Sequence, residues 1–218
     1  MRLHRGGRFR AWLGRRLGGD AALGDRAWRR ILHGLAGASV VYFALPAGAL
    51  GPVPNAAIPF AALAALALLE GLRLTGRIEL PVTRPYEARR PASYAYFGGA
   101  IVASALAFPR PIAIAVILGT ALVDPIAGEL RASPRWSAGY PWLAGAAYGA
   151  IALGSLAVAG PVPLLPAAGL AVLAAILALA AEAPTWTYVD DDLAMTLVPG
   201  VALTVLALLV PPLLAGVG

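Results

Sequence analysis

The sequence contains no cysteine and no lysine, and only 13% of its residues are charged. Without cysteine, the chain can form neither a disulfide nor a thiolate metal site. Without lysine, it has no ammonium group for binding phosphate or for forming a Schiff base. A soluble domain carries about 25% charged residues, whereas 60% of these 218 residues are hydrophobic. The composition therefore predicts a membrane protein.

Several motifs of nucleotide-binding and hydrolytic enzymes are also missing. The chain has no P-loop sequence, no G-x-G-x-x-G, no H-E-x-x-H and no nucleophile elbow. Any nucleotide must therefore be held without a P-loop.

The chain is rich in long apolar stretches, which charges and Pro/Gly clusters divide into lengths that suit a membrane. A transmembrane helix needs about 20 apolar residues. We expect an all-α integral membrane protein, a bundle of about seven transmembrane helices, although six or eight also fit the pattern. The expected spans lie near 31–50, 55–74, 93–109, 111–130, 139–160, 164–182 and 193–215. They form a single transmembrane domain, 31–218, after a basic tail, 1–30.

The arginines predict how this bundle is oriented. With the N-terminus in the cytosol, sixteen of the 17 arginines fall in the tail or in cytosolic segments, and only Arg110 falls outside. The carboxylates also fall on the cytosolic side, so a site built from them would open to the cytosol. We expect a multi-pass cell-membrane protein with a cytosolic N-terminus and a cytosolic active site. The basic tail is expected to contact lipid headgroups.

The stretch VDPIAGELR, Val123–Arg131, places ionisable residues directly after an apolar run. Pro125 disfavours helical geometry at Asp124, so we expect a broken helix that restarts with Asp124 as its N-cap. Such a terminus can receive phosphate, and Gly128 keeps its surface open to a bulky ligand. Asp124 and Arg131 could then face one ligand as a metal-binding carboxylate and a phosphate-binding guanidinium. The alternative is a capping aspartate with a snorkelling arginine.

A second acidic stretch, AEAPTWTYVDDDLAMTLVPG, runs from Ala181 to Gly200. Its three consecutive aspartates are more than the cap of a helix beginning near Leu193 requires. Asp190 and Asp191 are candidate oxygen ligands of a hard cation, and Glu182 faces the same compartment. The simpler alternative is an acidic turn with one cap.

Two shorter patterns carry further candidates. RRILHGLAG places Arg29, Arg30 and His33 at the start of the first span, although arginines there are also a common topological signal. LEGLRL places Glu70 and Arg73 three residues apart, a spacing that predicts a local ion pair.

Taken in order, RRILHGLAG, LEGLRL, VDPIAGELR and AEAPTWTYVDDDLAMTLVPG resemble the dolichol kinase and phytol kinase family. The resemblance implies a membrane-embedded kinase that phosphorylates a long-chain isoprenoid alcohol, using CTP or a related nucleotide. With Mg²⁺ as cofactor, Asp124, Asp190 and Asp191 are the expected metal ligands, and Glu182 is the expected base for the alcohol hydroxyl. The residues expected to contact nucleotide or phosphate are Arg29, Arg30, His33, Gly128 and Arg131, with Glu70 and Arg73 supporting the site.

The residues are also compatible with two other functions. Broken helices with ionisable residues occur in secondary transporters, here of a small anion or a lipid-linked substrate. The family's lysine-containing segment after its aspartate motif is replaced by AGYPWLAG, which favours a catalytically inactive relative that binds no nucleotide. We expect no nucleic-acid partner.

Overall fold

The computed structural model describes residues 21–78, 80, 87–160, 162–182 and 189–210, with side chains described from Arg30 onward. Within these residues the chain forms seven α-helices and two 3-10 helices, and no strand, which confirms the all-α expectation. The elements are α2 (Ala21–Ala38), η1 (Ser39–Ala44), α3 (Ala57–Leu74), α4 (Ser93–Ala107), α5 (Arg110–Ala132), η3 (Ser137–Gly139), α6 (Trp142–Ala159), α7 (Leu164–Glu182) and α8 (Asp191–Leu209).

Five of these helices, α3, α5, α6, α7 and α8, are long and apolar enough to cross a membrane. The segment Arg30–Ala44 and helix α4 are apolar but shorter. The seven expected spans correspond in order to α2 with η1 and to α3 through α8. The main difference is that α2 begins at Ala21, inside the stretch expected as a tail. Residues 1–20 of that tail, and the expected end of the last span, lie outside the described residues.

The outer surfaces of the helices are apolar, as a lipid environment requires. Val158 on α6 is 89% exposed and Leu165 on α7 is 84% exposed. In water such exposure would cost free energy, because each apolar Å² that leaves water contributes about 25 cal/mol. The exposed apolar side chains therefore support a helical membrane protein.

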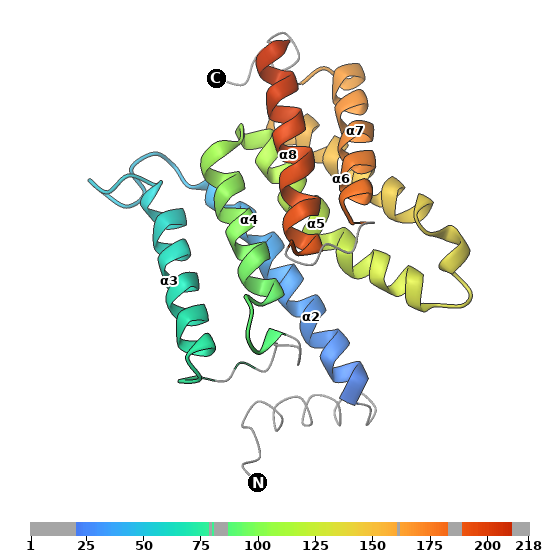
Figure 1. Ribbon diagram of the computed structural model, residues 1–218. Helices are drawn as coiled ribbons and strands as arrows, with labels where there is room; N and C mark the ends of the chain where they lie inside the picture. The colour runs from blue at the N-terminus through green and yellow to red at the C-terminus, as the bar shows by residue number, and fades with distance from the viewer. Residues whose placement is uncertain (1–20, 79, 81–86, 161, 183–188, 211–218) are drawn as a thin grey trace.

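Helix α5 forms the centre of the bundle and packs against α2, α4, α6 and α8 (Figure 1). Small residues allow these helices to approach closely. A Cβ at Gly119 would lie 2.5 Å from Cζ of Tyr148, so the tyrosine ring occupies the space that a side chain would need. Tyr148 is itself buried, and its hydroxyl donates to the carbonyl of Met195 on α8 at 3.3 Å.

The expected break at Asp124 is wrong. Helix α5 continues through Pro125 to Ala132, so Asp124 lies inside the helix and is not its N-cap. Pro125 removes one backbone hydrogen bond, but twelve residues of α5 are buried against neighbouring helices. In membrane proteins, packing of this kind keeps helices continuous across a proline. The position of Asp124 therefore follows from tertiary packing rather than from a helix terminus.

Successive helices run in opposite directions, and this collects most charged residues at one end of the bundle. The C-terminal ends of α3, α5 and α7 lie at the same end as the N-terminal ends of α2, α4 and α8 (Figure 1). Among the described residues, Arg110 at the start of α5 lies toward the opposite end. The chain thus concentrates its ionisable groups on one side.

Candidate functional site

Three ionisable residues from three helices meet at the charged end of the bundle. His33 of α2, Asp124 of α5 and Asp192 of α8 place their ligand atoms within 4.8 Å of one another. His33 Nε2 lies 3.5 Å from Asp124 Oδ2 and 3.9 Å from Asp192 Oδ2. All three residues are buried, with exposed fractions of 6%, 6% and 3%. We call these residues the His33–Asp124–Asp192 cluster.

One aromatic contact and one pair of threonines surround the cluster. The ring of His33 stacks on Phe97 of α4, with centroids 5.3 Å apart. One turn below the cluster, the Thr196 hydroxyl lies 2.7 Å from the Asp192 carbonyl and 3.0 Å from Thr120 Oγ1. This hydrogen bond between two buried threonines joins α5 to α8. Each threonine lies four residues, about one helical turn, from the aspartate of its own helix. The cluster is therefore built on rigid, packed helices.

The cluster offers one imidazole nitrogen and two carboxylates, a donor set that suits a divalent cation. Carboxylate oxygens are the usual ligands of Mg²⁺, and imidazole also binds Mn²⁺ and other first-row metals. The three ligand atoms come from separate helices, so only the folded chain brings them together. Asp124 was expected to bind metal together with Asp190 and Asp191. The structure places Asp124 with His33 and Asp192, and it places Asp190, Asp191 and Asp192 in a second group whose ligand atoms also lie within 4.8 Å of one another.

The first two residues of the aspartate triplet lie beside this cluster at the start of α8. Asp190 is the N-cap, and its Oδ1 accepts a hydrogen bond from the backbone N of Asp192 at 3.2 Å. Its Oδ2 accepts a hydrogen bond from the hydroxyl of Ser93 at 2.6 Å. Asp191 lies in the first turn of α8, where its carboxylate also accepts from the backbone N of Asp192. Asp190 is thus the capping aspartate that the sequence allowed for.

Glu182, the expected base, closes the end of α7 in an ion pair. Arg131 Nη1 lies 2.6 Å from Glu182 Oε1, and the Tyr140 hydroxyl donates to Glu182 Oε2 at 3.0 Å. The Arg131 guanidinium also lies over the Tyr140 ring, 5.1 Å from its centroid. Burial and the nearby Glu182 carboxylate raise the pKa of Tyr140, which therefore stays a hydrogen-bond donor. Glu182 lies close enough to Asp124 and Asp191 for their charges to act on it.

A surface cavity of about 440 Å³ lies along the last two turns of α5. The residues that line it are Arg30, Pro125, Ile126, Glu129, Leu130, Ser133 and Trp136. Its polar wall is an ion pair of 2.5 Å between Arg30 Nη2 and Glu129 Oε1, both half-exposed. The remaining wall is mainly apolar, so the cavity suits an amphiphilic ligand.

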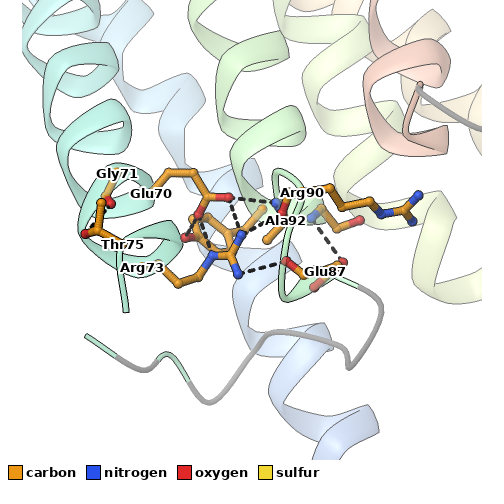
Figure 2. Close-up of polar contacts among 9 residues, drawn as sticks. Glu70, Gly71, Arg73, Thr75, Glu87, Arg90 and Ala92 are labelled. Atoms are coloured by element: carbon orange, nitrogen blue, oxygen red, sulfur yellow. Dashed lines mark hydrogen bonds and ion pairs between the residues drawn. The ribbon is translucent and has the colours of Figure 1, made fainter. Parts of the chain in front are cut away.

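The predicted Glu70–Arg73 ion pair is confirmed, and it is part of a larger network (Figure 2). Arg73 Nε lies 2.7 Å from Glu70 Oε2, and Arg73 Nη2 lies 2.6 Å from Glu70 Oε1. Arg73 also donates to the carbonyls of Glu87 and Arg90, at 2.9 and 2.7 Å. Glu70 in turn accepts from the backbone N of Ala92 at 2.9 Å. The Tyr94 hydroxyl also donates to Glu70 Oε2. We call these residues the Glu70–Arg73 clamp.

Of the other residues expected to contact nucleotide or phosphate, Gly128 has an open surface, whereas Arg30 and Arg131 form ion pairs with carboxylates. At Gly128, no heavy atom lies within 4 Å of the place that a Cβ would occupy, so its surface is open as expected. Arg30 and Arg131, both expected at phosphate, are paired with Glu129 and Glu182. The side chain of Arg29 lies outside the described residues.

Sequence reasoning missed Asp192, Ser93 and Tyr140 as members of the site. Asp192 is one of three adjacent aspartates, and only the start of α8 decides which one points toward α5. No sequence pattern pointed to Ser93 or Tyr140, because their hydrogen-bond partners, Asp190 and Glu182, are 97 and 42 residues away in sequence.

Comparisons with models of protein families, with curated proteins and with solved structures found no match to this chain.

Proposed function

We propose that this protein is a membrane-embedded kinase that transfers a phosphoryl group from CTP, or a related nucleotide, to a long-chain isoprenoid alcohol. The observation that carries the proposal is the buried His33–Asp124–Asp192 cluster at the charged end of the bundle. Ionisable groups inside a membrane bundle are costly and mark functional sites. The resemblance of RRILHGLAG, LEGLRL, VDPIAGELR and AEAPTWTYVDDDLAMTLVPG, in that order, to the dolichol kinase and phytol kinase family supports the same function.

The cluster provides a way to bind the nucleotide without a P-loop. In phosphoryl transfer, catalysis comes mainly from positioning and from neutralising phosphate charge. His33, Asp124 and Asp192 would hold the Mg²⁺ that this family requires. When bound, the cation neutralises charge on the oxygens of the transferred phosphoryl group.

The Arg131–Glu182 pair supplies both a cation and a carboxylate next to the cluster. Arg131 is 41% exposed at its side chain, whereas the Glu182 side chain is buried. In this proposal, Arg131 turns to the phosphate of the nucleotide, which releases Glu182 from its ion pair. The alcohol oxygen attacks the γ-phosphorus, the bond to the β-phosphate oxygen breaks, and the hydroxyl proton passes to Glu182. CDP and the lipid phosphate are the products.

The cavity along α5 offers a place for the lipid acceptor. Pro125, Ile126 and Leu130 give it an apolar wall, and Trp136 also lines it. Tryptophan is enriched at the level of lipid headgroups. An isoprenoid chain lying on this wall would keep its hydroxyl close to the turn of α5 that carries Asp124.

For the topology, we propose seven membrane spans, a cytosolic N-terminus and a C-terminus on the outside. Sixteen of the 17 arginines then lie on the cytosolic side. A reporter fused after Gly218 tests this arrangement. An external reporter signal supports seven spans, and a cytosolic signal contradicts them.

The direct test of function is incubation of purified protein in detergent with labelled CTP, Mg²⁺ and a panel of isoprenoid alcohols. The expected product is a labelled lipid phosphate. The matched control is the Asp124→Asn variant, which keeps size and helix packing and removes one carboxylate charge. Absence of labelled lipid from the wild-type protein with every alcohol and nucleotide contradicts the kinase proposal. Uptake of labelled substrate into vesicles would instead support a transporter.

A further inference from the structure

We propose that Ser93 is a positioning residue that sets the metal affinity of the His33–Asp124–Asp192 cluster from outside it. The inference rests on the proposed function in one respect, that the cluster binds a divalent cation. Ser93 lies at the start of α4, and its hydroxyl is hydrogen-bonded to Asp190 rather than to a cluster residue. Its effect would pass through Asp190 and the N-terminal turn of α8.

The first step is the hydrogen bond between Ser93 and Asp190. Ser93 Oγ lies 2.6 Å from Asp190 Oδ2, across 97 residues of sequence. A serine at a helix start commonly caps its own helix, but the N-cap of α4 is Ala92, whose side chain makes no capping hydrogen bond. The hydroxyl of Ser93 is instead directed at the cap of a different helix. A hydrogen bond to a charged group is about twice as strong as one between neutral groups.

The second step links Asp190 to the cluster. Asp190 uses its other oxygen, Oδ1, to accept from the backbone N of Asp192. The carboxylate of Asp190 therefore bridges the α4 hydroxyl and the first turn of α8. Rotation of this carboxylate would shift the backbone at Asp192, whose own side chain faces His33 across 3.9 Å. Metal sites require their ligands to stay within a few tenths of an ångström.

The third step is the anchoring of Ser93 itself. Its backbone N donates to Glu87 Oε1 at 3.2 Å, and the preceding backbone N, of Ala92, donates to Glu70 Oε1 at 2.9 Å. Glu70 is held in turn by two hydrogen bonds from Arg73. Figure 2 shows how Arg73 and Glu70 reach from α3 to the segment that precedes α4. The Glu70–Arg73 clamp thus gives Ser93 a fixed base from which to orient Asp190.

The experiment is Mn²⁺ binding, measured by electron paramagnetic resonance on the purified full-length protein in detergent, without nucleotide or alcohol. Residues that support metal ligands without contacting the metal contribute about 10–100-fold to affinity. We expect Ser93→Ala to weaken Mn²⁺ binding by about 10-fold, at the low end of that range. Ser93→Thr keeps the hydroxyl and is expected to retain wild-type affinity.

The matched control is Ser104→Ala, which removes another hydroxyl from α4. Ser104 is buried, and its Oγ has no hydrogen-bond partner among the described residues. We expect unchanged Mn²⁺ affinity in this variant. Thermal unfolding of all three variants shows whether a loss of affinity reflects general destabilisation, which Ser104→Ala would share.

The outcomes separate the inference from the proposed function. Mn²⁺ binding to the wild-type protein with equal affinity in Ser93→Ala overturns the positioning role and leaves the metal site standing. Failure of Ser93→Thr to restore affinity also overturns it, because the hydroxyl would not be the cause. If the wild-type protein binds no Mn²⁺, the metal site assigned under the proposed function falls, and the positioning role falls with it.

Discussion

The Glu70–Arg73 clamp and the His33–Asp124–Asp192 cluster lie at the same end of the bundle, and both bury charged groups. They differ in how those charges are matched. In the clamp, Arg73 donates four hydrogen bonds, and its distances are 2.6–2.9 Å. In the cluster, two carboxylates share one histidine, and the nearest distances from His33 Nε2 are 3.5 and 3.9 Å. The clamp joins opposite charges at hydrogen-bond distance, whereas the cluster brings two carboxylates to one imidazole.

This difference indicates different roles. A buried ion pair with good geometry and further hydrogen bonds offsets its desolvation cost and fixes the structure around it. An imidazole nitrogen and two carboxylates whose ligand atoms lie within 4.8 Å of one another instead form a donor set that a divalent cation can occupy. The clamp therefore fits a role in stability, and under the proposed function the cluster binds the metal. Variants that act on only one property test this division.

The largest effect is expected for Arg73→Met in the clamp. This change leaves the Glu70 carboxylate buried without its cation, and breaking a buried pair in this way costs about 3–5 kcal/mol. The measurement is the free energy of unfolding in detergent. The double variant Glu70→Gln with Arg73→Met removes both charges and is expected to lose less than Arg73→Met alone. A loss below about 1 kcal/mol, the range of exposed pairs, would contradict the role of the clamp.

A smaller effect on stability, but a large one on binding, is expected for Asp124→Asn in the cluster. Residues that only support metal ligands contribute up to about 100-fold to affinity. Removing a ligand itself should weaken Mn²⁺ binding by more than this, and activity should fall with it. Because asparagine has nearly the same size and can still form hydrogen bonds, the metal-free melting temperature should stay close to that of the wild-type protein. Wild-type Mn²⁺ affinity in a folded Asp124→Asn variant would remove Asp124 from the site.

The smallest effect is expected for Tyr140→Phe, which removes a single hydrogen bond to a buried carboxylate outside both regions. The variant loses the hydrogen bond from the Tyr140 hydroxyl to Glu182 but keeps the ring under Arg131. A hydrogen bond to a charged group contributes about 1.5–3 kcal/mol, and the remaining Arg131 contact should limit the loss to the lower value. Unfolding in detergent measures it. Unchanged stability would show that Arg131 alone satisfies Glu182.

The helices and their order could be predicted from the sequence, because apolar stretches and the charges and Pro/Gly clusters between them are local features of the chain. The Glu70–Arg73 pair was also predictable, since its three-residue spacing on a helix brings the side chains together. Its partners at Glu87, Arg90 and Ala92 were not, because they depend on how the chain returns from α3 to α4. Local spacing therefore indicates a pair but not the network around it.

The candidate site was only partly predictable for the same reason. Asp124 was expected to be a metal ligand at a proline-induced break, but α5 is continuous and its packing supplies the position of this residue. The aspartate triplet was identified as a unit, yet a difference of two residues in the start of α8 decides which carboxylate faces the cluster. Periodicity leaves helix ends uncertain by a few residues. Tertiary contacts supply the missing information.

The bond between Ser93 and Asp190 also bears on how the protein is made. A chain that is inserted into the membrane from its N-terminus completes α2, α4 and α5 long before it completes α8. Asp190 and Asp192 arrive with the last helix, so neither the cap nor the cluster exists until that helix is in place. The earlier helices can pack beforehand without bringing both carboxylates together. The site is thus completed only at the end of biosynthesis, when the whole bundle is present to hold both carboxylates.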